Sequence, residues 1–196
     1  MKRLISLTLS IAICFTFLFT TATPASAYQL RGYKVDEPLI FYAYSGFGAE
    51  SRAHMRSAAL AWNACVESFT PLVMSTSTHS ATSGYGNSDG KNYIYRINAG
   101  TVYVAQNRTS IRYGVVEEFD ININVYYSWA NSAQPNCYDV YSIVLHELGH
   151  TMGLEDLDER SGLSYETAVM WGEARTNRIK RDLKQDDING IAAKYG

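Results

Sequence analysis

Histidine, cysteine and proline are scarce in this chain of 196 residues, which holds four histidines, three cysteines and four prolines. It also lacks an excess of either charge, with 17 Lys and Arg against 19 Asp and Glu and a net charge of -2. Because binding to nucleic acid relies on clustered positive charge, no nucleic-acid partner is expected. The 46% of hydrophobic residues is typical of a globular protein, and 15 tyrosines and 14 glycines favour strands and loops.

Long apolar runs are absent except near the amino end. A basic pair at residues 2–3 precedes an apolar stretch over 4–19, and small residues follow at 25–27. This pattern predicts a secretory signal peptide over residues 1–27. A membrane anchor is the alternative, but the run is short for a span of about 20 residues and contains Ser and Thr. We therefore expect residues 28–196 to form one secreted, monomeric domain without a membrane span.

The few cysteines leave little choice of pairing. Cys14 lies in the predicted signal peptide, so Cys65 and Cys137 remain in an oxidising compartment. A disulfide between them would close a loop of about 70 residues and stabilise the fold by about 4 kcal/mol on the chain-entropy model. The alternative is two reduced, buried thiols, and we expect the disulfide.

Hydrophobic spacing predicts an α+β domain in which strands come first and two helices lie in the second half. A polar, glycine-rich loop is expected over residues 77–92, and mostly loop after Gly153. The expected strands cover residues 38–47, 70–76, 93–98, 101–107 and 114–127, and the expected helices cover 49–69, 138–152 and 186–196.

The sequence HELGH places His146 and His150 four residues apart with Glu147 between them. On a helix the two imidazoles lie on one face, about 5.4 Å apart along the axis, so both can bind one ion. Glu147 lies one step around the helix, where its carboxylate reaches water held by the metal. Two unrelated helix histidines are the alternative, which the scarcity of histidine makes improbable.

A catalytic zinc usually takes three protein ligands, so a third is expected. Gly153 follows the helix and can adopt the positive φ that reverses the chain. Asp156 would then return to the ion, and a carboxylate oxygen is an acceptable zinc ligand. We favour Asp156 over its competitors, which are Glu155 and Asp158 nearby and Glu166 and Glu173 further along the chain.

These motifs resemble those of a known family. HELGHTMGLED is similar to the metzincin signature HExxHxxGxxH/D, and ETAVMW resembles the metzincin Met-turn, which would make Met170 the methionine beneath the metal. SIVLHELGHTMGL, FDININVYYSW and LKQDDINGIAAKYG resemble segments of the matrixin branch. The resemblance implies a metzincin-like zincin domain, with a mixed twisted sheet, an active-site helix, a Met-turn and a C-terminal helix.

The sequence also departs from most matrixins. Asp156 stands where most have a third histidine, a variant found in the small secreted snapalysin-like metzincins. Besides the motif pair, the chain has only His54 and His79, so the histidine-rich second zinc site of animal matrixins cannot be assembled. Apart from Cys14 in the predicted signal peptide, no cysteine stands before the catalytic domain to act as a thiolate latency switch.

The resemblance further implies that an extended substrate lies against an edge strand, which we expect at Val102, Tyr103, Val104 and Ala105. Asp89 and Asp120 are candidate ligands for structural calcium, as in many relatives, and the sequence leaves calcium undecided. The sequence thus predicts a secreted endopeptidase that uses one zinc ion and Glu147 as general base to hydrolyse proteins or peptides. The alternative is a secreted zinc-binding module with little or no proteolytic activity.

Overall fold

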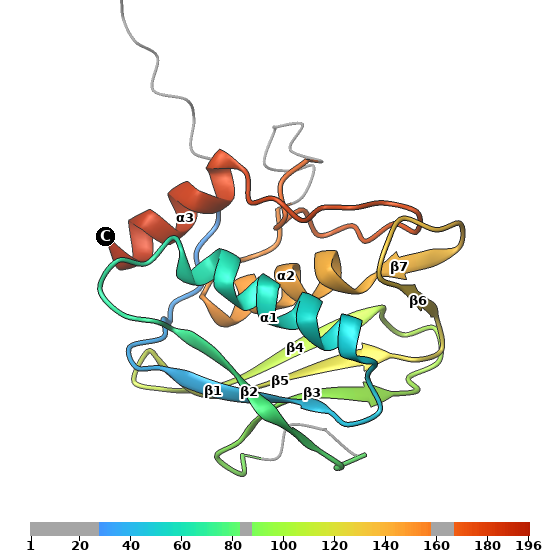
Figure 1. The fold of residues 1–196 in the computed structure, drawn as a ribbon. Coiled ribbons are helices and arrows are strands. Elements are labelled where there is room, and N and C mark those ends of the chain that lie inside the picture. Colours follow the sequence, from blue (N-terminus) through green and yellow to red (C-terminus); the bar gives the residue numbers. More distant parts are fainter. Residues whose placement is uncertain (1–27, 83–87, 158–166) are drawn as a thin grey trace, which may run out of the picture.

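The structure is a computed structural model, which describes residues 28–82, 88–157 and 167–196 (Figure 1). The predicted signal peptide over residues 1–27 lies outside the described residues, as do the candidate ligands Asp158 and Glu166. Within the described part, no helix combines the length and the apolar character needed to cross a membrane.

A five-stranded twisted sheet forms one layer of the protein, in the order β2-β1-β3-β5-β4. The neighbours β2, β1, β3 and β5 pair in parallel, and β4 pairs with β5 in the antiparallel sense. Because β4 is the last strand, its outer edge is left without a strand neighbour. The strands are β1 (Leu39–Tyr44), β2 (Leu72–His79), β3 (Asn92–Ile97), β4 (Ala105–Arg112) and β5 (Val115–Asn124).

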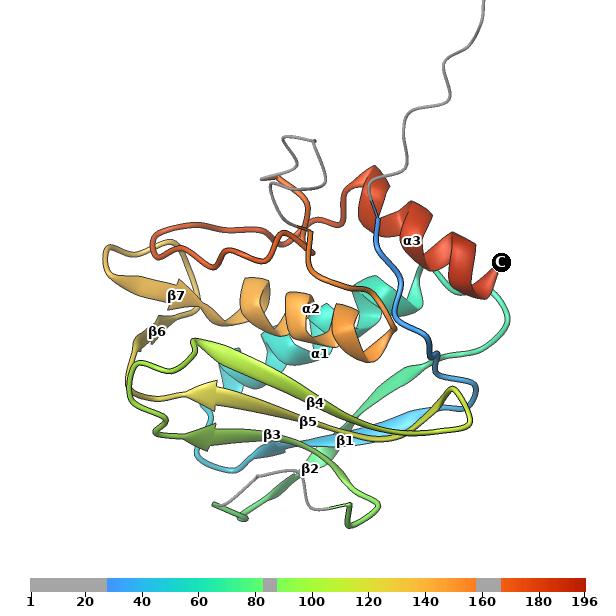
Figure 2. The same ribbon diagram turned by 180° about the vertical axis from the view of Figure 1, so that it is seen from behind.

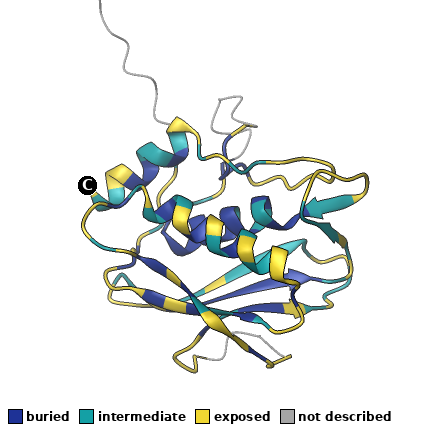
Figure 3. Cartoon of the chain, in the orientation of Figure 1, coloured by how far each residue is buried: buried dark blue, intermediate teal, exposed yellow. Residues whose placement is uncertain are grey.

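Two helices, α1 (Ala49–Asn63) and α2 (Val140–Thr151), lie side by side across one face of the sheet (Figure 1). The core lies between these layers, and Figure 3 shows buried residues on the facing sides of the helices and the sheet. The third helix, α3 (Gln185–Tyr195), packs at one end of the helical layer. The main core side chains are Phe41, Phe119, Ile121, Ile123, Met55, Trp62, Leu145 and Leu148.

This arrangement confirms the predicted α+β class and mixed sheet. The predicted end of the first helix was wrong, because α1 stops at Asn63 and not near residue 69. The side-chain amide of Asn63 donates to the backbone carbonyl of Leu72, and the backbone amide of Leu72 donates back to Asn63 Oδ1. This contact joins the end of α1 to the start of β2, so the chain leaves the helix there.

The predicted edge strand was also displaced, because β4 begins at Ala105 and Val102 lies outside it. Two side-chain hydrogen bonds explain the shift. The side-chain amide of Asn124 donates to the carbonyls of Gly100 and Tyr103, which holds the segment before β4 as a loop. The strand then extends to Arg112, where a two-residue turn with positive φ at Tyr113 and Gly114 returns the chain into β5.

A small parallel pair, β6 (Ser128–Ala130) and β7 (Cys137–Asp139), leads into α2 and was not predicted. The predicted disulfide was wrong, because Cys65 and Cys137 are both free thiols. Cys65 follows α1 at the end near α3, where burial raises its pKa. Cys137 opens β7 at the opposite end of the helical layer, so the two thiols do not meet (Figure 1).

Candidate metal centre

Helix α2 begins with a side-chain cap. Asp139 Oδ1 accepts hydrogen bonds from the Ser142 amide at 2.9 Å and from the Ser142 hydroxyl at 2.6 Å. The Arg181 guanidinium contacts the same carboxylate and contributes to a pKa of Asp139 below its ordinary value, although burial acts in the opposite direction. The cap fixes the start of α2, and the helix then places His146 and His150 on one face.

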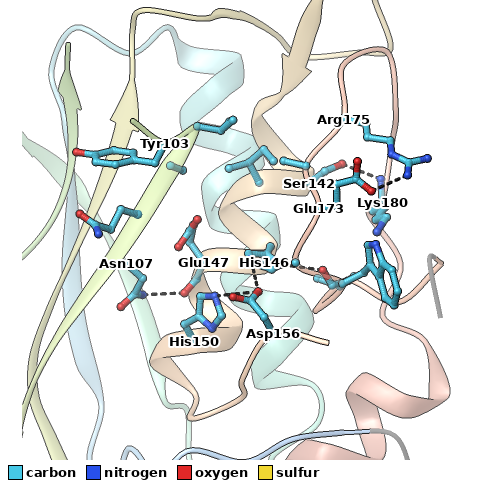
Figure 4. A pocket seen from close by; sticks show the side chains of 18 of the residues that line it. Tyr103, Asn107, Ser142, His146, Glu147, His150, Asp156, Glu173, Arg175 and Lys180 are labelled. Atoms are coloured by element: carbon cyan, nitrogen blue, oxygen red, sulfur yellow. Dashed lines mark hydrogen bonds and ion pairs between the residues drawn. The ribbon is translucent and has the colours of Figure 1, made fainter. Parts of the chain in front are cut away.

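The chain reverses immediately after α2 at Gly153, which has a φ of 85°. A Cβ atom at this position would lie 2.4 Å from the carbonyl oxygen of Tyr33, so only glycine fits without a shift of the backbone. The reversal brings Asp156 beside the two histidines, as Figure 4 shows. The sequence-based expectation for this turn therefore matches the observed backbone.

Three donor atoms, one each from His146, His150 and Asp156, lie within 4.8 Å of one another. Asp156 Oδ1 is 3.1 Å from Nε2 of His146 and 3.5 Å from Nε2 of His150. Ligands of a tetrahedral zinc with bonds of 2.0–2.1 Å are separated by about 3.3–3.4 Å. The donor types and the two distances to Asp156 fit a zinc ion.

Both imidazoles are oriented by backbone carbonyls. Nδ1 of His146 donates to the carbonyl of Val169, and Nδ1 of His150 donates to that of Leu154, each at 2.9 Å. Because a carbonyl only accepts, each Nδ1 carries the proton and each Nε2 is left to face the shared point. Hydrogen bonds of this kind fix both the ring orientation and the tautomer of a metal-binding histidine.

The pKa values of the two histidines are shifted in opposite directions. Burial, together with the neighbouring His146, lowers the pKa of His150 to about 4, so His150 is neutral at pH 7. Burial also acts to lower the pKa of His146, but the Asp156 carboxylate and Glu147 outweigh it and raise the net value. The same negative groups would attract a metal cation.

Glu147 projects from α2 beside the donor cluster, and its residue surface is only 6% exposed (Figure 4). Burial raises its pKa to about 7, with the Asp156 carboxylate adding to the effect and His146 opposing it. A carboxyl group with such a pKa can both accept and return a proton near neutral pH.

Sequence reasoning gave Asn107 on β4 no role at the metal site, yet it contacts the active-site helix. The side-chain amide of Asn107 donates to the backbone carbonyl of Glu147 and to the Thr151 hydroxyl, both at 2.7 Å. These bonds tie the edge strand to α2 at the position of Glu147. The distance between β4 and the helix is therefore set by a polar side chain as well as by apolar packing.

Met170 lies under α2, as the predicted Met-turn requires. A Cβ atom on Gly149, between the two histidines, would lie 2.3 Å from the Met170 sulfur and 2.8 Å from the Trp62 ring. The backbone of this turn is held by Asp187 of α3, whose carboxylate accepts from the amides of Val169 and Met170 at 3.0 Å each. Sequence reasoning missed Asp187 because its partners are 17–18 residues away.

A cavity of about 500 Å³ opens over the donor cluster. The start of β4 and the segment before it form one wall, where Tyr103, Val104 and Ala105 line the cavity, whereas Val102 is 79% exposed and lies outside it. The opposite wall is formed by residues 171–175, with Arg178 and Lys180 beyond. The cavity therefore runs between β4 and the chain that follows the Met-turn.

The competing third ligands within the described residues lie elsewhere. Glu155 forms an ion pair with Arg31 at 3.0 Å, and Glu173 pairs with Arg175 at 2.5 Å near the rim of the cavity. Neither joins a group of three metal-binding side chains in the described part of the chain. Asp156 is thus the only one of these described competitors that meets the histidines.

The calcium candidates Asp89 and Asp120 lie near Glu118, at the sheet face turned away from the helices. The three carboxylates accept hydrogen bonds from backbone amides: Asp89 from Lys91, Glu118 from Gly90 and Asp120 from Tyr93. Among the described residues, these three carboxylates are not close enough to one another to form a group that could hold a metal ion. Asp89 and Asp120 therefore stay candidates only, and calcium stays undecided, as in the sequence analysis.

Comparison with known proteins gives three results. The family model described as Matrixin matches residues 48–196. Interstitial collagenase of Sus scrofa is 37% identical over 59 residues, which cover 30% of this chain and 11% of the pig protein, and the Bos taurus collagenase is 34% identical over 68 residues, covering 35% and 13%. The chain therefore matches only about a tenth of the length of these relatives.

Among solved structures, the chain is similar to high choriolytic enzyme 1, a hatching enzyme zinc-protease from the medaka fish Oryzias latipes. The two share 13% sequence identity with a TM-score of 0.45, over 83% of this chain and 93% of the medaka chain.

Proposed function

We propose a function from one premise: the chain belongs to the matrixin family. The resemblance read from the HELGH and Met-turn segments is thereby confirmed. On this premise the protein is a zinc endopeptidase, secreted from the cell, that hydrolyses peptide bonds in proteins or peptides. The observation that carries the proposal is the cluster of three donor atoms from His146, His150 and Asp156 at the base of the cavity.

In this proposal the three clustered side chains hold the zinc ion and Met170 supports the helix beneath them. When bound, zinc supplies a Lewis acid that polarises the scissile carbonyl and lowers the pKa of water. Glu147 takes a proton from the attacking water and later delivers it to the leaving nitrogen. Its burial and its position beside the cluster support this role. The negative charge of Asp156 makes the water less acidic than three neutral imidazoles would.

We place the substrate along the outer edge of β4. This edge has no strand neighbour, and residues 103–107 line the cavity. An extended peptide pairing there would gain main-chain hydrogen bonds, which give affinity with little demand on sequence. The pairing region is moved from the sequence-based expectation, because the strand begins at Ala105 and Val102 does not line the cavity.

The catalytic role of Glu147 is tested by Glu147→Gln. We expect cleavage of casein to fall by about 100- to 10,000-fold, because the amide cannot accept the proton. Zinc content, measured by atomic absorption, should stay near one ion per chain. Cleavage that persists in this variant but stops with a chelator would contradict the role of Glu147. Wild-type protein that binds zinc but cleaves nothing would favour the zinc-binding module.

The third ligand is tested by comparing Asp156→Ala with Glu173→Gln. Asp156→Ala should weaken zinc binding by more than about 100-fold, beyond the loss seen for groups that only support ligands. Glu173→Gln is the matched control, since it removes a carboxylate at the cavity rim outside the donor cluster. Unchanged zinc affinity in Asp156→Ala would refute the proposed ligand set.

Secretion and the monomeric state are tested directly. After expression of the full chain, the protein should appear in the medium with an amino terminus at Tyr28, as read by Edman degradation or mass spectrometry. Light scattering should give the mass of a single chain. Retention in the membrane fraction would instead indicate that residues 1–27 form a membrane anchor.

A further inference from the structure

The segment that carries Asp156 is paired with the beginning of the described chain. Leu30 forms an antiparallel bridge with Leu154. The Arg31 amide donates to the carbonyl of Gly153, and the Glu155 amide donates to the carbonyl of Gln29, each at 2.9 Å. Figure 2 shows this first segment, in blue, passing between helix α3 and the chain that follows α2. The backbone on both sides of Leu154 is thus bonded to residues more than 120 positions away.

Side chains reinforce the same pairing. Nε of Arg31 lies 3.0 Å from the carboxylate of Glu155, the residue next to Asp156. The Tyr33 hydroxyl donates to the carbonyl of His150 at 3.0 Å and accepts from the Arg31 guanidinium. Residues 29–33 therefore contact the C-terminal end of α2 and the ligand segment, and their described hydrogen bonds do not involve Nε2 of either histidine.

The other side of residues 29–33 is bound to α3. Lys194 Nζ donates to the carbonyls of Arg31 and Tyr33, at 2.7 and 2.6 Å. The Tyr195 hydroxyl donates to the carbonyl of Met152 and accepts from the amide of Val35. The first segment is thus fixed between the last helix and the turn at Gly153, so it can transmit the rigidity of both to the ligand segment.

We propose that residues 29–33, named here the N-terminal strap, position Asp156 for metal binding. The ligand segment is irregular, and an irregular segment loses conformational entropy when it is fixed on an ion. The strap removes that freedom before the ion arrives, by pairing with both neighbours of Leu154. Partners that orient metal ligands without touching the metal typically contribute 10- to 100-fold to affinity. This inference rests on the proposed zinc ligand set.

The test uses two proline variants of the full chain. Arg31→Pro removes the amide that donates to Gly153, and the extended conformation of Leu30 in its bridge suits a residue before proline. Lys34→Pro is the matched control, because the Lys34 amide makes an equivalent bond of 3.0 Å to Gly114, in the β4–β5 turn. Zinc affinity is measured by competition with a chromophoric chelator, and the melting temperature of the metal-free protein is measured in parallel.

We expect Arg31→Pro to weaken zinc binding by 10- to 100-fold, whereas Lys34→Pro leaves the affinity within about twofold of wild type. The proposal is overturned if both variants lose affinity in proportion to their melting temperatures, or if Arg31→Pro binds zinc like wild type. Should Arg31→Pro not fold, Arg31→Met removes the contacts to Glu155 and Tyr33 together with a positive charge that acts on Asp156. Loss of this charge by itself would favour a bound cation, so a weaker zinc affinity would still reflect the lost contacts. Its matched control is Arg112→Met, which removes the exposed ion pair with Glu117.

For this side-chain pair, a weaker zinc affinity in Arg31→Met alone supports the strap, and equal affinities of the two variants overturn it. These results are separable from a failure of the proposed function. Wild-type protein that binds no zinc would refute the ligand set itself. Wild-type protein that binds zinc tightly while all strap variants match it would refute only the strap.

Discussion

The proposed metal ligands are held in two contrasting ways. His146 and His150 belong to one regular helix, whose spacing and capping are local, and their rings are fixed by nearby carbonyls. Asp156 belongs to an irregular segment, which is held by a glycine turn, by the strap and by contacts with the chain after the Met-turn. The helical half depends mainly on neighbours in sequence, with the Val169 carbonyl at His146 as the exception, whereas the other half depends on distant parts of the chain.

This contrast indicates where the site is vulnerable. Damage to the helix is expected to lower the stability of the whole fold, because α2 is packed on α1 and β5. Damage to the segment after Gly153 is expected to lower metal affinity more than stability. Three substitutions probe this difference, and their expected effects on zinc affinity decrease in the order given below.

Gly153→Ala should have the largest effect on the metal centre. The new Cβ atom would meet the carbonyl of Tyr33 at 2.4 Å, and the φ of 85° disfavours any residue with a side chain. We expect zinc affinity to fall by about 10- to 100-fold and the free energy of unfolding by about 2–3 kcal/mol. Chelator competition measures the zinc affinity, and calorimetry measures the free energy of unfolding. A variant that keeps its zinc affinity would show that Asp156 does not depend on this turn.

Gly149→Ala should disturb stability more than metal binding. Its Cβ atom would lie 2.3 Å from the Met170 sulfur and 2.8 Å from the Trp62 ring. The overpacking costs about 1–3 kcal/mol, and the better helix propensity of alanine offsets up to about 1 kcal/mol. Thermal unfolding of the metal-free protein should therefore shift downward, while zinc affinity changes by less than about tenfold. A larger loss of zinc affinity than in Gly153→Ala would reverse the comparison.

Asp120→Asn should leave zinc affinity unchanged, because Asp120 lies on β5 at the sheet face away from α2. Burial raises the pKa of Asp120 to about 7, and Glu118 and Asp89 add to the effect. A folded-state pKa above the unfolded value means that this group's contribution is present below about pH 4 and is lost as the pH rises through 7. The melting temperature of Asp120→Asn relative to wild type should therefore increase between pH 5 and pH 8.

The same measurement tests whether Asp89 and Asp120, the two calcium candidates, bind calcium. Calcium bound between Asp120 and Asp89 would favour the charged carboxylates, so adding calcium should reduce the difference between the variant and wild type at pH 8. Parallel melting temperatures of the two proteins from pH 5 to pH 8 without calcium would refute the raised pKa of Asp120.

Much of the fold class and of the metal cluster could be predicted from short stretches of sequence. The four-residue spacing of His146 and His150 gives a shared face on any helix, and Gly153 marks the place where the helix can reverse. The edge strand was placed too early because its start depends on Asn124, which holds the preceding loop through its side chain. The predicted Cys65–Cys137 bridge failed for a related reason, since counting cysteines says nothing about where α1 and β7 lie.

The sequence alone determined that two imidazoles on one helix face, with a carboxylate between them in sequence, would be followed by a glycine turn. Helix periodicity and glycine's freedom at positive φ act over only a few residues. Tertiary structure decided how Asp156 is presented, because its segment is bonded to residues 29–33 and these to Lys194. It also decided that Asp187 would hold the Met-turn and that Asn107 would join β4 to α2. Such contacts form only when the chain is folded, since each partner is defined by proximity in space and not by spacing in sequence.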